Sequence, residues 1–172
     1  MQTAWGACAL CALNLALLPP AASAQGPSPW LGTWTLNLEK SVYNPGPPPY
    51  KRASYRIEPL DSARGKPLQD GLKVVYDMVR PRGGVTHMEW TGRLDGMDYA
   101  VQGVEEYVTN AYRAVGDREW DVVLKVDGRV AATSRISLSA DGNTMTTVTT
   151  GRNAQGAEVR TTTVYERSRA PE

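Results

Sequence analysis

Short segments in which apolar and polar residues alternate recur along most of the chain. In residues 32–38, for example, Thr35 and Asn37 separate Trp34, Leu36 and Leu38. Because successive side chains of a β-strand point to opposite faces, this period of two predicts a strand with one buried face. The same pattern recurs between turn residues and predicts about ten strands. Their expected ranges are 32–38, 53–59, 72–79, 85–92, a short strand around 99–101, 107–115, 119–126, 129–138, 144–150 and 158–167.

The segments between these strands are rich in turn-forming residues. Asp127-Gly128 gives the strongest hairpin signal, since this pair supplies the positive φ angles of a type I′ turn. The proline-rich tract 45–49 is excluded from a central strand, and residues 61–71 are expected to form a polar loop. No segment shows the apolar spacing of an amphipathic helix with a cap before it and a glycine after it.

This order of strands and short connections predicts an up-and-down antiparallel sheet, because no connection has room for a crossover helix. An open sheet of ten strands would expose two edges, and closure removes both. The predicted fold class is therefore all-β, a closed antiparallel barrel of about ten strands without a helical lid. A sandwich of two sheets is the alternative.

The first residues have the form of a secretory signal peptide. An apolar run ends at Pro19-Pro20, and Ala22-Ser23-Ala24 then matches the small-residue pattern of a cleavage site. The run is too short for a membrane span, although no lysine or arginine precedes it. We expect a signal peptide over residues 1–24, a barrel domain over 25–168, a disordered tail over 169–172, and a secreted or periplasmic location.

Cysteine and charge content narrow the classes of function. Cys8 and Cys11 both lie in the signal segment, so the mature chain is expected to contain no disulfide. The chain has 19 basic and 18 acidic residues, a net charge of +1, and no basic cluster suited to nucleic acid. Motifs for nucleotides and calcium are absent from the sequence. We therefore expect no cofactor, no nucleic-acid partner and no membrane span in the mature form; the oligomeric state is left open.

Both ends of the barrel segment resemble the calycin superfamily, which includes lipocalins and fatty-acid-binding proteins. Gly32-Thr33-Trp34 matches the G-x-W motif that begins these barrels, and residues 30–36 are similar to the opening of fatty-acid-binding proteins. Residues 163–167 are similar to the closing strand of those proteins. Residues 30–41 with the 45–49 tract resemble a secreted, lipocalin-like family of bacteria. The resemblance implies a ten-stranded barrel that encloses a small ligand.

Two positions differ from the fatty-acid-binding pattern. Those proteins carry a helical lid between their first two strands, where this chain has only the short proline-rich segment 41–50. Their closing strand also carries an arginine, two residues before a tyrosine, that binds the ligand carboxylate. Tyr165 matches that tyrosine, but Thr163 stands in the place of the arginine.

Several strand residues are candidates for a ligand site inside the barrel. Apolar and aromatic side chains on inward faces would form its wall, and a few hydroxyl groups would orient the ligand. The predicted ligand-binding residues are Trp34, Met88, Trp90, Trp120, Thr163 and Tyr165. The predicted function is binding of a small hydrophobic or amphipathic molecule. The opposing possibility is that these side chains fill the barrel and leave no pocket.

Two other functions are considered. A filled barrel could act as an interaction module of the cell envelope through its outer face or the 45–49 tract. An enzyme would have to use His87, the only histidine, together with Glu89. These two residues share one face of a strand, but no cysteine pair completes a zinc site and no nucleophile motif is present. We therefore expect them to be a solvent-facing polar pair on a non-enzymatic protein, with no catalytic or metal-binding residue.

Overall fold

A computed structural model describes residues 28–61, 67–152 and 156–168. The predicted signal peptide, its two cysteines and the tail after residue 168 lie outside these ranges. The described residues form ten strands and no α-helix. The strands are β1 (Gly32–Asn44), β2 (Arg52–Asp61), β3 (Pro67–Val79), β4 (Val85–Arg93), β5 (Tyr99–Gln102), β6 (Val108–Gly116), β7 (Glu119–Val126), β8 (Arg129–Leu138), β9 (Thr144–Arg152) and β10 (Glu158–Arg167).

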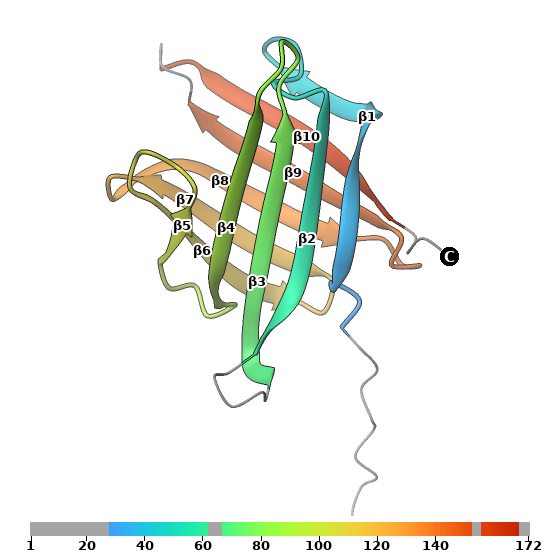
Figure 1. Ribbon diagram of the computed structural model, residues 1–172, viewed down its shortest axis with the longest axis vertical. Helices are drawn as coiled ribbons and strands as arrows, with labels where there is room; N and C mark the ends of the chain where they lie inside the picture. The colour runs from blue at the N-terminus through green and yellow to red at the C-terminus, as the bar shows by residue number, and fades with distance from the viewer. Residues whose placement is uncertain (1–27, 62–66, 153–155, 169–172) are drawn as a thin grey trace, which may run out of the picture.

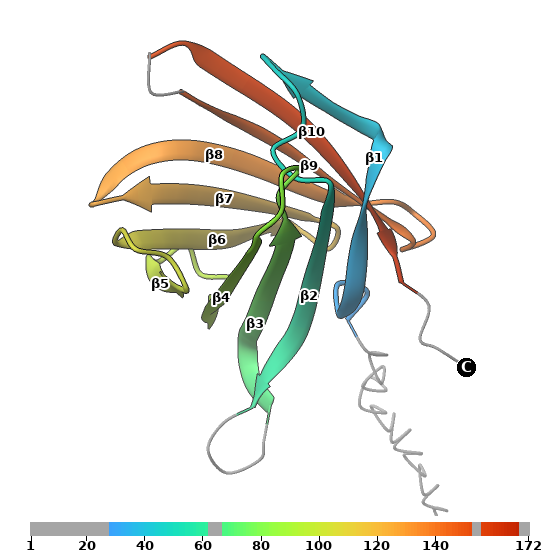
Figure 2. The ribbon, with the colours of Figure 1, turned by 45° about the horizontal axis from the view of Figure 1, so that its top comes forward.

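The ten strands form one closed antiparallel barrel in which every strand pairs with its neighbours in sequence. The wall runs from β1, blue in Figure 1, through green and yellow strands to the red β10, which pairs with β1 again. Figure 2 shows the same wall from another side. Across the closing seam Leu36 lies opposite Tyr165, and Asn37 lies opposite Val164. The predicted fold class is therefore confirmed.

Several strands are longer than the sequence pattern predicts, β1 and β3 by the most residues. β1 continues to Asn44, because an irregularity between Asn37 and Val42 shifts its register against β10 and lets pairing resume. The expected polar loop over 61–71 is wrong at both ends, since β2 includes Asp61 and β3 begins at Pro67. Backbone pairing extends these strands where side-chain alternation gives no signal. The hairpin at Asp127-Gly128 is as predicted, with φ angles of 48° and 75°.

An arginine near the end of β10 links both ends of the barrel segment. The Arg167 guanidinium lies 4.2 Å from the ring centre of Trp34 and donates hydrogen bonds to the carbonyls of Pro29, Leu31 (2.7 Å) and Gly142 (2.9 Å). Gly32 has a φ of 126°, and a Cβ there would stand 3.0 Å from the same guanidinium. The Gly32-Thr33-Trp34 motif is thus the place where the first strand passes beneath this arginine.

The barrel has a packed end and an open end. In an up-and-down barrel alternate connections lie at the same end, so the N-terminal segment, the β6–β7 turn and the β8–β9 turn share one end. Most of the buried core lies there. It comprises Trp30, Trp34, Tyr55, Ile57, Leu72, Val74, Trp90, Tyr112, Trp120, Val122, Ile136, Leu138 and Met145. The connection between β1 and β2, which contains Pro45–Pro49, lies at the other end.

Candidate functional site

Four tryptophans close the packed end. Trp30 stacks on Trp120 with ring centres 3.8 Å apart and planes 18° from parallel. Each of Trp30, Trp34 and Trp90 donates its indole N–H to a backbone carbonyl, at 3.1, 3.1 and 3.0 Å. Buried indole N–H groups need such partners, so these rings are fixed in place. They form a solid floor beneath the rest of the interior.

Above this floor the interior of the barrel holds a cavity of about 590 Å³ that opens to solvent. All ten strands contribute to its wall, as does the segment between β1 and β2. The lining residues are Leu36, Tyr43, Asn44, Pro45, Pro47, Pro49, Tyr50, Tyr55, Tyr76, Met78, Met88, Val101, Val108, Asn110, Tyr112, Val122, Leu124, Ser134, Ile136, Thr147, Thr149, Val159, Thr161, Thr163 and Tyr165. A volume of this size is typical of pockets for small molecules.

The two sides of the cavity differ in chemistry. Strands β3 to β7 supply mostly methionine, valine and leucine side chains, such as Met78, Met88 and Leu124. Strands β8 to β10 supply a row of hydroxyl groups, within which Ser134 and Thr149 are hydrogen-bonded at 2.8 Å. None of the described lining residues carries a charged side chain. The cavity is therefore amphipathic but uncharged.

Three tyrosine hydroxyls meet where the floor joins the cavity. Tyr55 and Tyr76 face each other on paired strands, and Tyr112 reaches them from β6. The Tyr55 hydroxyl lies 2.6 Å from that of Tyr112 and 3.1 Å from that of Tyr76, and the Tyr76 and Tyr112 hydroxyls also form a hydrogen bond. The Tyr112 ring packs on Trp90, with centres 4.4 Å apart. We refer to Tyr55, Tyr76 and Tyr112 as the tyrosine cluster.

Burial keeps these phenols protonated. Desolvation raises the pKa of Tyr55 and of Tyr112 well above the ordinary value of 10, and it also raises the pKa of Tyr76. The pKa of Tyr165, on the adjoining wall, is raised for the same reason. Loss of a proton would leave a charge in a poorly solvated space without a cation beside it. The cavity therefore presents neutral hydroxyl groups at physiological pH.

Two polar atoms on lining residues have no hydrogen-bond partner among the described residues. They are Oδ1 of Asn110 and Oγ1 of Thr147. Asn110 occupies the inward position next to Tyr112 on β6 and is 7% exposed. An unsatisfied buried polar atom costs about 1–3 kcal/mol, which makes it uncommon in a filled protein core. Both atoms are themselves buried, so they lie in the wall behind the surface of the cavity.

The structure divides the six predicted site residues into two groups. Met88, Thr163 and Tyr165 line the cavity. Trp34, Trp90 and Trp120 do not line it, because their rings belong to the packed floor and are 0%, 0% and 2% exposed. Both groups face the interior, and only the packing of the whole barrel decides which residues line the cavity and which lie in the floor. A role in ligand binding stays a prediction for all six residues.

Sequence reasoning missed most of the aromatic lining. Six of the eight tyrosines line the cavity, and only Tyr165 was predicted to do so; the others are Tyr43, Tyr50, Tyr55, Tyr76 and Tyr112. The sequence did indicate an inward position for Tyr76. Residues 74, 76 and 78 are two apart, so the Tyr76 side chain lies on the same face of β3 as those of Val74 and Met78. Pro45, Pro47 and Pro49 also line the cavity, which could not be foreseen from a tract with no strand pattern.

His87 and Glu89 lie on the outer wall. The His87 side chain is 54% exposed, and its Nδ1 lies 2.6 Å from a carboxylate oxygen of Asp77. The Asp77 carboxylate raises the pKa of His87, and Glu89 lies 3.4 Å from its Nε2. The predicted solvent-facing position of this pair is confirmed. Across the part of the chain that the structure describes, no group of three or more potential metal ligands is found.

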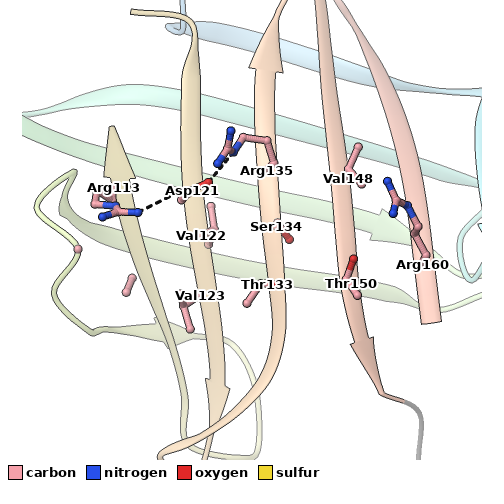
Figure 3. Close-up of a pocket in the computed structure, with 12 residues that line it drawn as sticks. Arg113, Asp121, Val122, Val123, Thr133, Ser134, Arg135, Val148, Thr150 and Arg160 are labelled. Atoms are coloured by element: carbon pink, nitrogen blue, oxygen red, sulfur yellow. Dashed lines mark hydrogen bonds and ion pairs between the residues drawn. The ribbon is translucent and has the colours of Figure 1, made fainter. Parts of the chain in front are cut away.

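A second hollow, of about 570 Å³, lies on the outer face of β6 to β10 (Figure 3). Asp121 sits between two arginines, 3.0 Å from Arg113 and 2.5 Å from Arg135, as the dashed lines in Figure 3 show. These arginines lower the pKa of Asp121. The lining also includes Arg160, so three arginines face the single carboxylate of Asp121 and this hollow has an excess of positive charge.

Comparisons with known proteins bear on the fold. A search of solved structures matched an S-type phycobiliprotein lyase, CPES, from Guillardia theta, with a TM-score of 0.50 and 12% identity over 83% of this chain and 90% of that chain. The fold is a lipocalin-like barrel. The siderocalin Ex-FABP also matched, with a TM-score of 0.39 and 17% identity over 84% of this chain and 74% of that chain.

At these identities the first likeness shows the fold alone. A scan against protein-family models found no match, and neither did a search of curated proteins. Within the described ranges of this lipocalin-like barrel, no helix is long and apolar enough to cross a membrane.

Proposed function

We propose that this lipocalin-like barrel binds and carries a small amphipathic molecule in its interior. The observation that carries the proposal is the cavity of about 590 Å³ to which all ten strands contribute. A barrel that served only as a scaffold would gain stability by filling that space, since interiors are otherwise close-packed. Its apolar side can bury a hydrocarbon surface at about 25 cal/mol per Å², and its hydroxyl row can orient a polar group.

We also propose that the chain is exported, as a member of the secreted lipocalin-like family of bacteria that its ends resemble. Support comes from the apolar run and the Ala22-Ser23-Ala24 site that precede the barrel. Intact-mass measurement of the chain recovered from the periplasm or medium should give a mature form beginning at Gln25. A chain recovered only at full length inside the cell would contradict export, but it would leave the binding proposal untouched.

Binding can be tested with Nile red, an uncharged dye whose fluorescence rises in apolar surroundings, and by native mass spectrometry of the purified chain. Leu124→Trp adds a large ring to the cavity wall, whereas Val123→Trp adds the same ring to the outer face of the same strand. We expect the first variant to lose dye binding and the second to keep it. Equal binding by both variants, or no binding by the natural chain, would rule out an interior site.

A variant of the outer wall tests the alternatives, an interaction module that uses the outer face or an enzyme built on His87. His87→Ala alters the outer wall only, so it should leave binding of the dye unchanged. Loss of binding in that variant would show that the relevant surface lies outside the barrel.

A further inference from the structure

The hydroxyl groups of the tyrosine cluster are hydrogen-bonded mainly to one another. Three hydroxyls form three mutual hydrogen bonds, so each of the three protons is used within the cluster. The Tyr76 oxygen also accepts a hydrogen bond from the Asn110 side chain, so the hydroxyl oxygens of Tyr55 and Tyr112 are the ones that keep a lone pair for a further hydrogen bond. The cluster consequently offers acceptors to a ligand and has no proton left to donate.

The lack of charged side chains in the described lining also favours a ligand with a neutral polar end. The described lining contains no lysine, arginine or histidine that could balance an anion. The tyrosines of the cluster have raised pKa values and stay neutral. A carboxylate placed against the cluster would give up its hydration shell, face lone pairs and gain no counter-ion. Burial of an unpaired charge is strongly unfavourable, far more so than burial of a hydroxyl group that finds an acceptor.

The placement of polar groups sets the orientation of the ligand. The tyrosine cluster and Asn110 lie deep, next to the tryptophan floor, and Asn110 Oδ1 lacks a partner among the described residues. Nearer the open end the lining includes Pro45, Pro47 and Val159. A ligand that enters with its polar end first can donate a hydrogen bond to the tyrosine cluster while its hydrocarbon part contacts these apolar residues.

We infer that the cavity selects amphipathic molecules whose polar end carries no negative charge and donates a hydrogen bond, such as a long-chain alcohol, and discriminates against long-chain carboxylates. This inference rests on the proposed function, because it assigns a ligand class to the same cavity. The recognition element is the tyrosine cluster.

The test is a competition experiment on the natural chain. Nile red is bound first and then displaced with 1-dodecanol or with dodecanoate, at about pH 8, where the acid is ionised, and below the micellar concentration. We expect the alcohol to displace the dye at a concentration at least about tenfold lower than the carboxylate does, given the cost of burying an unpaired charge. Equal or tighter binding of dodecanoate would overturn the inference.

A variant tests the role of the cluster itself. Tyr76→Phe removes one hydroxyl and leaves the Tyr55–Tyr112 hydrogen bond of 2.6 Å, which uses one of the two remaining protons. The other proton becomes available to a carboxylate, so the alcohol-to-carboxylate preference should fall severalfold. Tyr107→Phe is the matched control, because Tyr107 is 63% exposed and does not line the cavity, and it should keep the preference of the natural chain.

The outcomes separate the two proposals. If the dye does not bind, the proposed function itself fails. If the dye binds and both amphiphiles displace it equally, binding stands and the selectivity is wrong. If the preference exists but Tyr76→Phe leaves it unchanged, the tyrosine cluster is not what recognises the head group.

Discussion

The guanidinium of Arg167 lies over the indole ring of Trp34, 4.2 Å from its centre. These residues stand on the two strands that meet at the closing seam, where Trp34 is opposite Arg167 in the register. The same guanidinium donates to carbonyls of the segment before β1 and of the β8–β9 turn. One side chain therefore ties together three parts of the packed end.

Replacement of Arg167 by alanine should destabilise the barrel by about 2–4 kcal/mol, since it leaves three carbonyl groups without this donor and removes the ring contact. Urea unfolding followed by tryptophan fluorescence measures the change. Arg113→Ala is the control, because Arg113 forms an exposed ion pair with Asp121 that should contribute less than about 1 kcal/mol. Similar losses in both variants would contradict the linking role of Arg167.

Truncating a side chain of the tryptophan floor should lower the free energy of unfolding more than truncating a side chain of the cavity wall. Trp120→Ala removes a ring that is 2% exposed and stacked on Trp30, so we expect a loss of about 3–5 kcal/mol. Leu124→Ala enlarges a space that already exists, and its expected cost is about 1–2 kcal/mol. Denaturant unfolding of both variants provides the comparison. Equal costs would indicate that the cavity wall is as tightly packed as the floor.

Alanine substitutions at two glycines with positive φ angles should distinguish the cost of backbone strain from the cost of steric overlap. A Cβ on Gly103, at φ 86°, would overlap the carbonyl oxygen of His87, whereas a Cβ on Gly46, at φ 101°, would meet nothing within 4 Å. Gly46→Ala should therefore cost about 1–2 kcal/mol from its conformation alone. Gly103→Ala should cost at least about 3 kcal/mol, because β4 must also shift.

Thermal unfolding of these two variants checks this difference. A Gly103 variant that is as stable as the Gly46 variant would mean that the segment after β5 moves freely away from β4.

Acid should weaken the turn between β8 and β9. Hydrogen bonds from the Ser139 hydroxyl and from the backbone and side chain of Asn143 lower the pKa of Asp141 from 3.8 to about 2. Because the pKa is lower in the folded state, the ionised carboxylate stabilises the fold above about pH 4, and this contribution is lost as the pH falls towards 2.

Asp141→Ala should therefore be less stable than the natural chain at pH 7, and the difference should shrink between about pH 4 and pH 2. Urea midpoints measured across this range give the answer. A difference that is constant with pH would mean that the carboxylate charge has no part in holding the turn.

Much of the fold could be predicted from local patterns. The strand at Glu119–Val126 was predicted with the bounds that the structure shows. It lies between two turn signals, and its inward face is apolar while its outward face includes Glu119, Asp121 and Lys125. The limits of β1 and β3 could not be predicted in this way. Pairing with β10 and with β2 extends them through residues whose side chains do not alternate.

The sequence by itself determined the strands, their order and the need to close the wall, since these depend on local periodicity, turn chemistry and the cost of open edges. Only the tertiary structure decided which inward-facing residues fill the barrel and which surround a space. Trp90 and Met88 share one face of the same strand, yet one packs in the floor and the other lines the cavity. The tyrosine cluster likewise depends on the barrel, because Tyr55 and Tyr112 are 57 residues apart in the chain. Burial and hydrogen bonding across the lumen arise from all ten strands together, and no single strand contains that information.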